Sequence, residues 1–533
     1  MLSYSNSEIW HGPNTKLYCF FGFFVQSGKR RLSYKQNQMP NTLFIMLPYK
    51  TLIDPDRKSS VPLYIQICQQ FIALIANGTL QPGDALPSSR KLSELISVNR
   101  NTIKLAYDEL NSQGWAESAG TIGIFVLATL PVVEKKLNKA FAEKTVAENP
   151  FIWTNHFQNA VTAQNLQKSV LAIDDGFPDV RLAPVDVLMR EYRSISKRFY
   201  GKNFLKYGNP KGSEHLRISI ENYLSTTRGF KVSSENIMIT KGSQMGIYIA
   251  ARLLLEPTDT IAVGFSNYAS ADATFKLTGA SLLRIPVDEF GMDTDFLEQV
   301  LHQKKIKAVY VIPHHHCPTT VTMSMERRLK LLSLARDYRF AIIEDDYDFD
   351  FHYENKPYLP LASIDQNQNV IYIGSLSKTF APALRIGFMT GPENFINAAA
   401  SLRKLMERQG DTLMEEAFAT LFDTGEMDRH FRKSIKIYKE RRNAFCEILK
   451  QDFSNHIEFK VPEGGLAVWS HFDSKIDLVR LSEKASANGL HISNGNFYKN
   501  EIFSVNGLRL GFASVNETEM LKAFEILKKT IGQ

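Results

Sequence analysis

The sequence lacks the cysteine patterns of a disulfide framework or a cysteine zinc site. Its 533 residues contain four scattered cysteines and no C-x-x-C pair: Cys19, Cys68, Cys317 and Cys446. Disulfide-rich domains and zinc sites need cysteines at close, repeated spacings. Neither feature is indicated, and the reducing cytoplasm is the compartment that we expect.

The sequence also lacks an apolar run long enough to cross a membrane. The run Leu17 to Val25 has nine residues, whereas a transmembrane helix needs about 20. Gly28-Lys29-Arg30-Arg31 follow where a signal peptide would be cleaved. We expect no membrane partner. Residues 1–45 form a doubtful extension, and Met39 and Met46 precede domain-like sequence, so a start codon assigned too far upstream is one explanation.

A large charge surplus is missing too. The net charge of +7 is compatible with a polyanionic partner but does not require one. Hydrophobic residues at 44% and charged residues at 22% are typical of globular proteins. At about 150 residues per domain, the length predicts three or four globular units.

The first of these units begins at Val61. Apolar residues recur at helical spacing from Leu63 to Ile75, and Asn77-Gly78 closes this helix. A short helix follows Ser88, a third runs from Asn101 to Gln113, and the glycine-punctuated residues 115–126 suit a small β-hairpin. Two short helices separated by a tight turn predict a helix-turn-helix, and the hairpin predicts a wing.

The start of the third helix has the side chains that DNA recognition uses. The N-terminal residues of a recognition helix meet base edges in the major groove, and cations nearby meet phosphates. The candidates for base contact are Arg100, Asn101, Thr102 and Lys104, and Arg90 at the preceding helix is the candidate for phosphate contact. Any module of three capped helices can carry some basic residues, so this pattern alone leaves the DNA interpretation open.

Residues 128–172 have the composition of a linker, with several lysines and alanines. After Asp174, short apolar runs alternate with helical stretches. The predicted strands are 237–240, 260–263, 281–286, 308–312, 341–344, 370–373 and 386–390. This alternation predicts a largely parallel sheet flanked by helices, which binds ligands at the carboxyl ends of its strands.

Several of these ends carry chemistry suited to a phosphorylated aldehyde. Lys378 follows a strand in a loop with Ser375 and Ser377, and Arg385 lies seven residues further on. A lysine with a lowered pKa forms a Schiff base with an aldehyde, while hydroxyls and a guanidinium hold a phosphate. An ordinary loop lysine fits these residues equally well.

Three other strand ends could complete such a site. Gly242 and Ser243 open a helix, where free backbone N–H groups bind phosphate. Asp345 and Asp346 end a buried strand, and a protonated pyridine nitrogen would supply the cation that a buried carboxylate needs. Tyr268 could cover a flat ring, although a core tyrosine is the alternative.

Longer motifs extend these patterns to known families. The segments PLYIQI, LPSSRKLSELISVNRNT and GIFV resemble the winged-helix domain of GntR-family transcription regulators over residues 61–127. The segments YGNPKG, EDDY and SLSKTFAPALRIG resemble fold-type I pyridoxal-phosphate aminotransferases over residues 173–531. In this order the two domains are similar to the MocR-type subgroup of GntR regulators, which GFPD at residues 176–179 also matches.

The resemblance implies a fold and residue roles. The fold is a winged helix-turn-helix followed by a large α/β aminotransferase-like domain with a small C-terminal α+β subdomain. Lys378 would bind pyridoxal 5'-phosphate covalently, Asp345 rather than Asp346 would pair with the ring nitrogen, Tyr347 would donate to the ring oxygen and Tyr268 would stack. Gly242, Ser243, Ser375, Ser377 and Arg385 would hold the phosphate, and Arg509 would bind a substrate or effector carboxylate.

The sequence also departs from these families. The wing tip around residues 119–124 is uncharged, which puts its DNA contact in doubt. Where the aminotransferases have Asn-Pro-Thr-Gly, this chain has Cys317-Pro318-Thr319-Thr320, without the asparagine that tunes the ring oxygen. His314-His315-His316 suggest a metal, but alternate strand residues face opposite sides, so we expect a structural role and no metal site.

Together the two halves predict a DNA-binding transcription regulator. Its aminotransferase-like domain would carry pyridoxal phosphate and sense a small amino compound, or sense the cofactor itself. The likeness and the spacing of DNA half-sites both imply a homodimer. The alternative is a working aminotransferase with an appended DNA-binding head, and a third possibility is a cofactor-free scaffold. Whether the chain is an enzyme stays open, with at most weak transamination expected.

Overall fold

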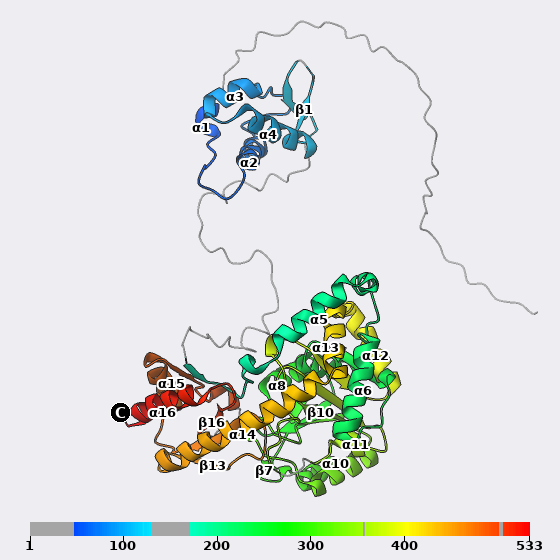
Figure 1. Ribbon diagram of the computed structural model, residues 1–533. Coiled ribbons are helices and arrows are strands. Elements are labelled where there is room, and N and C mark those ends of the chain that lie inside the picture. The colour runs from blue at the N-terminus through cyan, green and yellow to red at the C-terminus, as the bar shows by residue number, and fades with distance from the viewer. Residues whose placement is uncertain (1–46, 121, 130–170, 355–357, 500–504, 533) are drawn as a thin grey trace, which may run out of the picture. The chain divides into compact units, whose positions relative to one another are not determined.

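The structure is a computed structural model, and it describes residues 47–120, 122–129, 171–354, 358–499 and 505–532 (Figure 1). These residues fall into two compact units on either side of the segment 130–170, and each unit is described by itself. The predicted N-terminal extension and most of the predicted linker lie outside the described residues. The last two linker residues, Leu171 and Ala172, belong to strand β3 (Leu171–Ile173).

The first unit has the predicted winged helix-turn-helix fold. Its elements are α1 (Tyr49–Leu52), α2 (Leu63–Ala76), α3 (Ser89–Ile96), α4 (Arg100–Ser112), β1 (Ala116–Ser118) and β2 (Ile124–Val126). β1 and β2 pair antiparallel to form the wing. Apolar residues of α2, α3 and α4 pack into one core, with Phe71, Leu92 and Leu110 fully buried.

Capping residues set the turn between α3 and α4. Ser88 accepts a hydrogen bond from the backbone N–H of Lys91 at the start of α3 (3.3 Å), and Asn99 accepts one from that of Asn101 at the start of α4 (2.8 Å). Ser97 ends α3 in the left-handed conformation with φ of 55°. These caps satisfy backbone groups that a helix leaves free at its N-terminus.

A seven-stranded sheet forms the centre of the second unit. Its strands are β4 (Ile237–Thr240), β12 (Gly387–Thr390), β11 (Val370–Ser375), β10 (Ala341–Asp346), β9 (Ala308–Val311), β5 (Thr260–Gly264) and β6 (Ser281–Ile285), in this spatial order. β12 runs antiparallel to both of its neighbours, and the other four pairings are parallel. The largely parallel sheet predicted from the sequence is confirmed.

Helices cover both faces of this sheet, as Figure 1 shows. On one face α7 (Ser243–Leu254), α8 (Ala269–Lys276) and α12 (Glu393–Met406) bury their apolar residues against the strands. On the other face lie α5 (Val185–Lys197), α6 (Glu214–Arg228), α9 (Thr294–Leu301), α10 (Met325–Tyr338), α11 (Leu361–Ile364) and α13 (Thr412–Asp423). Because both faces are covered, the strands are mostly apolar, and β10 carries its carboxylates only at its carboxyl end.

A smaller α+β subdomain completes the second unit. It contains a three-stranded antiparallel sheet of β13 (Ile457–Phe459), β14 (Ala467–Phe472) and β16 (Gly507–Gly511), and β15 (Leu490–Ile492) pairs with β3. The short strands β7 (Val287–Asp288) and β8 (Gly291–Met292) form a separate hairpin. The long helix α14 (Glu426–Asp452) and the helices α15 (Leu478–Ala487) and α16 (Glu517–Ile531) pack on the subdomain core.

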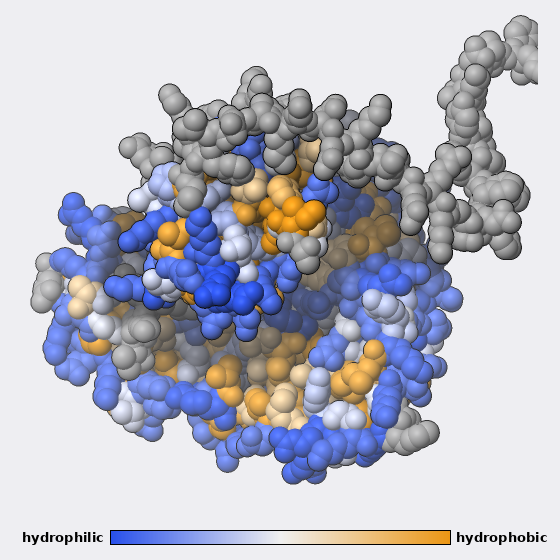
Figure 2. Space-filling view, turned by 90° about the horizontal axis from the view of Figure 1, so that it is seen from above, coloured by the Kyte–Doolittle hydropathy of each residue, from blue (hydrophilic) through white to orange (hydrophobic). Residues whose placement is uncertain are grey.

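None of the described helices has the length and apolar character needed for a membrane span. On the face drawn in Figure 2, hydrophilic residues cover most of the described surface and apolar residues form small groups.

Candidate functional site

A cavity of about 290 Å³ lies in the second unit, at the carboxyl ends of β10 and β11 and the N-terminus of α7. The residues that the sequence predicts for the site and that line this cavity are Lys378, Asp345, Tyr347, Tyr268, Ser243, Ser375, Ser377, Arg385 and Arg509. Gly242 lies against the Arg385 guanidinium. The fold therefore brings the predicted residues of this site together.

Lys378 projects into this cavity from the loop after β11. Its Nζ donates a hydrogen bond to the backbone oxygen of Gly176 (3.0 Å) and lies 4.0 Å from the ring centroid of Phe177. Burial lowers the pKa of Lys378 below its ordinary value, and Arg509 adds to this effect while Asp175 opposes it. A lowered pKa leaves more of the amine unprotonated, the form that attacks an aldehyde.

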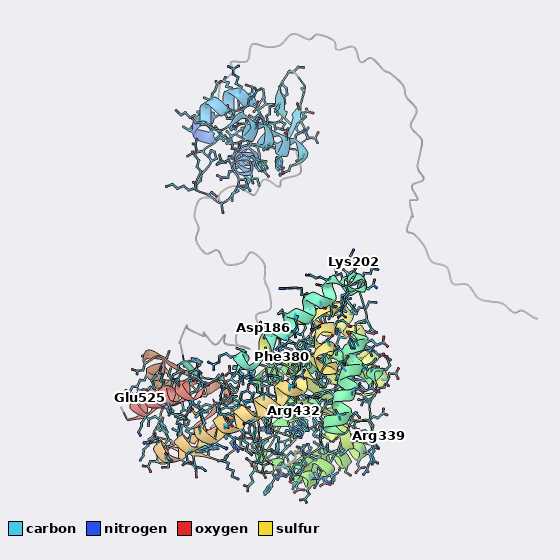
Figure 3. All side chains as sticks on the ribbon, viewed as in Figure 1. Asp186, Lys202, Arg339, Phe380, Arg432 and Glu525 are labelled. Carbon is cyan, nitrogen blue, oxygen red and sulfur yellow. The ribbon has the colours of Figure 1, made fainter. Side chains whose placement is uncertain are left out.

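The loop that carries Lys378 is held in place by the helices α13 and α14. Phe380, labelled in Figure 3, is buried with its ring 5.2 Å from that of Phe418 on α13. His430 on α14 donates from Nε2 to the backbone oxygen of Thr379 (2.7 Å). Packing on two helices therefore fixes the position of the lysine.

Asp345 presents a buried carboxylate that is only half satisfied. Tyr310 donates a hydrogen bond to its Oδ2 (2.6 Å), but its Oδ1 is buried without a partner among the described residues. Burial raises the pKa of Asp345 to about 7, although the Tyr310 hydrogen bond lowers it. A cation beside Oδ1 would stabilise the ionised form.

The neighbouring carboxylates point to the other face of the sheet, because strand residues alternate. Glu344 accepts hydrogen bonds from the backbone N–H groups of Leu361 (2.8 Å) and Ala362 (2.9 Å). Asp346 accepts one from the Tyr372 hydroxyl (2.8 Å). Burial raises the pKa of Asp346, but His314, Arg228 and the Tyr372 hydrogen bond together lower it to about 2. Asp345 is thus the carboxylate of β10 that lines the cavity.

One end of the cavity offers donors for an anion. Gly242 caps α7 with φ of 75°, and Ser243 is the first residue of that helix, where backbone N–H groups are free. Ser377 is 7% exposed and its Oγ has no hydrogen-bond partner among the described residues. Arg385 is exposed and anchored by a hydrogen bond from Nη2 to the backbone oxygen of Lys241 (2.9 Å).

Two tyrosines and Arg509 line the rest of the cavity. Tyr268 is half-buried and caps the N-terminus of α8. Tyr347 donates from its hydroxyl to the backbone oxygen of His315 (2.8 Å) and accepts from Nη2 of Arg509 (3.0 Å). Nη1 of Arg509 is buried without a partner among the described residues. A free guanidinium N–H of this kind can bind a carboxylate.

Sequence reasoning missed Asp175, Phe177 and Tyr498, which also line the cavity. The Tyr498 hydroxyl donates to Oδ1 of Asp175 across 323 residues of chain. The GFPD motif next to Asp175 was a signal for this segment. Nothing in the local sequence indicates that β3 lies beside the C-terminal subdomain, so the sequence alone could not reveal this contact.

The three consecutive histidines have separate partners. His314 donates from Nε2 to the backbone oxygen of Tyr358 (2.7 Å), His315 Nδ1 lies 2.7 Å from Oδ1 of Asp348, and His316 Nδ1 lies 2.8 Å from the Thr319 hydroxyl. The described residues contain no cluster of three or more potential metal ligands. The histidines act as buried hydrogen-bonding groups.

The predicted DNA-binding residues lie at the N-terminal ends of two helices in the first unit. Arg90 on α3 has a 79% exposed side chain with Nε 3.3 Å from Oε1 of Glu94. Arg100, Asn101 and Lys104 are exposed on the first turns of α4, and Thr102 beside them is half-buried. The described residues at the tip of the wing, 119, 120, 122 and 123, are uncharged.

Comparison with known proteins identifies both units. The family model for class I and II aminotransferases matches residues 179–528, and the model for bacterial regulatory proteins of the gntR family matches residues 63–126. In solved structures, the second unit is similar to the Pyrococcus horikoshii kynurenine aminotransferase, described in complex with PMP. The TM-score is 0.63 and the identity 28%, covering 68% of this chain and 90% of that one.

Two relatives are similar over both units. The uncharacterized HTH-type transcriptional regulator YisV of Bacillus subtilis is 28% identical, covering 87% of this chain and 95% of the relative. The probable rhizopine catabolism regulatory protein MocR of Rhizobium meliloti is 26% identical, covering 89% of this chain and 94% of the relative. With a GntR-type head in front of a class I and II aminotransferase domain, the chain belongs to the MocR-type subgroup of GntR-family transcription regulators.

Proposed function

We propose that this regulator binds pyridoxal 5'-phosphate in the cavity around Lys378 and changes its DNA binding in response to a small amino compound or to the cofactor itself. One observation carries the proposal. Three buried polar atoms in the wall of one cavity have no partner among the described residues: Oδ1 of Asp345, Oγ of Ser377 and Nη1 of Arg509. Unpartnered buried polar groups are costly and rare, so a polar ligand is expected to meet them.

These residues fit the proposed cofactor. Asp345 would accept a hydrogen bond from the protonated ring nitrogen, Ser243, Ser377 and Arg385 would hold the phosphate, and Lys378 would hold the aldehyde carbon. When bound, pyridoxal phosphate supplies an electron sink and an aldehyde that amines attack. Asp345 would keep the ring nitrogen protonated, because the negative carboxylate and the positive ring nitrogen stabilise each other.

The response to an effector would begin at Lys378 and Arg509. An effector amine would compete with Lys378 for the aldehyde and so would free the lysine, and the effector carboxylate would bind Nη1 of Arg509. Arg509 lies on β16 of the small subdomain and Lys378 follows β11 of the large sheet. A ligand that contacts both residues can favour one arrangement of the small subdomain and the large sheet over another.

A homodimer is part of the proposal. Large apolar side chains are exposed around residues 205–207 and 405–406, including Leu205 (72%), Tyr207 (77%) and Leu405 (85%). The two segments adjoin, because the Arg408 guanidinium lies 4.2 Å from the ring centroid of Tyr207. An apolar surface of this kind suits the contact between two copies. GntR-type heads would then meet two DNA half-sites.

The test starts from the full chain with added pyridoxal phosphate. Covalent attachment to Lys378 is expected to give a visible absorption band. Lys378→Ala is expected to abolish this band, while Lys276→Ala, which changes an exposed lysine on α8, is expected to keep it. Binding to DNA from upstream of the chain's own gene is then measured with and without a panel of amino acids. A band that survives in Lys378→Ala, or DNA binding that no amino compound and no cofactor alters, contradicts the proposal.

A working aminotransferase is the second candidate, because Lys378, Asp345 and Arg509 line the same cavity. Cys317 lines it where the enzymes have an asparagine that tunes the ring oxygen, which favours weak turnover. Burial raises the pKa of the Cys317 thiol to about 12. The thiol therefore stays neutral, and it lacks the amide with which the asparagine contacts the ring oxygen. Sustained product formation from amino donors and keto acids, without any effect on DNA binding, would favour the enzyme.

A further inference from the structure

The charged residues of the cavity outnumber those that the cofactor would use. Five charged residues are among the described residues that line it: Lys378, Arg385, Asp345, Arg509 and Asp175. In the proposed function, Lys378 binds the aldehyde, Arg385 binds the phosphate and Asp345 binds the ring nitrogen of the cofactor. Arg509 and Asp175 are left to face the effector, as one positive and one negative group.

These two groups are adjacent but do not satisfy each other. Nε of Arg509 donates to the backbone oxygen of Asp175 (3.2 Å) and lies 3.6 Å from its Oδ1, beyond hydrogen-bond distance. The Tyr498 hydroxyl donates to the same Oδ1. Oδ2 of Asp175 accepts no hydrogen bond from any described residue, and the side chain is 29% exposed. Nη1 of Arg509 is therefore buried without a partner among the described residues, and Oδ2 of Asp175 is left to the partly exposed side of its carboxylate.

The backbone fixes Asp175 beside Arg509. Oδ1 of Asp174 accepts hydrogen bonds from the backbone N–H groups of Gly176 (2.8 Å) and Phe177 (2.9 Å), which holds the turn around Asp175. The backbone oxygen of Asp174 accepts from the N–H of Gly511, two residues after Arg509 (2.8 Å). The spacing of the two charges is thus set by a main-chain hydrogen bond between the two segments and by the turn that Asp174 holds, and an effector must match it.

We propose that Asp175 makes the effector site selective for an amino acid with a second cationic group, a diamino monocarboxylate. The inference rests on the proposed function of the cavity. The effector carboxylate would take Nη1 of Arg509 and its second ammonium group would take Oδ2 of Asp175. A dicarboxylate would place its second negative charge near Asp175, whose like charge disfavours it. Apart from the Lys378 amine that the effector would free, the described residues of the wall offer that charge no further cation once the cofactor is bound.

The alternative role of Asp175 is to orient Arg509 through its backbone oxygen alone. The two roles predict different behaviour of Asp175→Asn. An amide keeps the shape of the side chain and can still accept from Tyr498, but it removes the negative charge. If Asp175 only positions Arg509, this substitution leaves effector selectivity unchanged.

The experiment compares ligands that differ in one group. The full chain loaded with pyridoxal phosphate is titrated with lysine, norleucine and glutamate, and binding is followed by the change in the cofactor absorption band. Norleucine has the length of lysine without its second ammonium group. Lysine is expected to bind more tightly than norleucine by on the order of tenfold, because hydrogen bonds to charged groups are the stronger ones. Glutamate is expected to bind more weakly than both. Ornithine and norvaline repeat the comparison one carbon shorter.

Asp175→Asn is expected to bring the lysine-to-norleucine ratio close to one and to strengthen glutamate binding. The control is Asp186→Asn, which removes one negative charge from the exposed first turn of α5 (Figure 3) and is expected to leave all ratios unchanged. If both diamino acids bind no better than their neutral counterparts, or if Asp175→Asn keeps the wild-type ratio, this inference is wrong and the proposed function stands. If pyridoxal phosphate gives no band, or no amine alters it, both fail.

Discussion

Tyr310 on β9 donates a 2.6 Å hydrogen bond to Oδ2 of Asp345 on the adjacent strand β10, which leaves Oδ1 of this buried carboxylate without a partner among the described residues. This arrangement favours opposite protonation states of Asp345 with and without a cationic ligand. Without one, burial raises the pKa of Asp345 to about 7. With a protonated ring nitrogen at Oδ1, the ionised carboxylate is favoured.

This pKa predicts how Asp345 changes stability with pH. In the unfolded chain the carboxyl loses its proton near pH 4, whereas in the folded, cofactor-free protein it keeps the proton up to about pH 7. The folded state then binds more protons, so the contribution of Asp345 to stability falls as pH rises from about 4 to about 7. Asp345→Asn removes this loss. Its unfolding free energy relative to wild type is expected to increase by on the order of 3 kcal/mol across this range.

Denaturant unfolding of both cofactor-free proteins at several pH values measures the difference, in which the other titrating groups cancel. The same substitution is expected to weaken pyridoxal phosphate binding, because an amide does not stabilise a protonated ring nitrogen. A parallel pH dependence of the two proteins would show that Asp345 titrates normally.

Gly242 gives a second prediction, on the phosphate end of the cavity. Its φ of 75° and ψ of 174° fall in a region that is essentially restricted to glycine, and an added Cβ would lie 2.7 Å from Nη2 of Arg385. Gly242→Ala is expected to cost about 1–3 kcal/mol of stability and to displace the guanidinium, which weakens phosphate binding.

Gly425 provides the control for Gly242→Ala. It also caps a helix with positive φ, 71°, but an added Cβ there meets no atom within 4 Å. Gly425→Ala is expected to cost less stability and to leave the affinity for pyridoxal phosphate unchanged, as measured by titration of the absorption band. Equal cofactor affinity in both variants would argue against a phosphate at Arg385.

The winged helix gives a third prediction. Its candidate residues for phosphate contact and for base contact should affect DNA binding in different ways when they are replaced. Arg90→Ala removes a charge directed at the phosphate backbone, so the slope of log affinity against log salt should fall by about 1. Asn101→Ala removes a base contact, so it should reduce discrimination between DNA sequences by about 1–3 kcal/mol with little change in the salt slope.

Binding of the full chain to DNA from upstream of its own gene, across a salt series and with single-base variants, separates these effects. Lys276→Ala in the other unit is the control and should change neither quantity. If Arg90→Ala keeps the wild-type slope, its ion pair with Glu94 is its main interaction.

The sequence predicted the seven strands of the central sheet well, because local signals decide them. Ile237–Thr240 and Val370–Ser375 are short apolar runs bounded by polar residues, and such runs form buried strands in any α/β sheet. The choice of Asp345 over Asp346 came from a resemblance. The alternation of β10 supplies its physical reason, since Asp345 shares a sheet face with the apolar residues that pack on α7.

Contacts across long stretches of chain could not be predicted in this way. Asp175 and Arg509 meet across 334 residues, and their contact depends on how β3 and β16 lie in the small subdomain. The resemblance implied that Tyr347 donates to a ring oxygen, and this stays a prediction; the hydrogen bond from the Tyr347 hydroxyl to the His315 backbone oxygen was not predicted. That hydrogen bond depends on the position of the loop after β9, which no local pattern indicates.

Arg509 gives a last prediction, which tests whether the arrangement of its guanidinium N–H groups matters in addition to its positive charge. Nη2 is occupied by the Tyr347 hydroxyl and Nε by the backbone of Asp175, so Nη1 is the N–H group left for a carboxylate. A lysine at this position keeps one positive charge but cannot make all three contacts. Arg509→Lys is therefore expected to weaken binding of norleucine on the order of tenfold. Pentylamine, which lacks the carboxylate, should bind the variant as it binds the wild type. Both affinities follow from titration of the cofactor band, and an equal loss for the two ligands would mean that Arg509 shapes the cavity without binding the carboxylate.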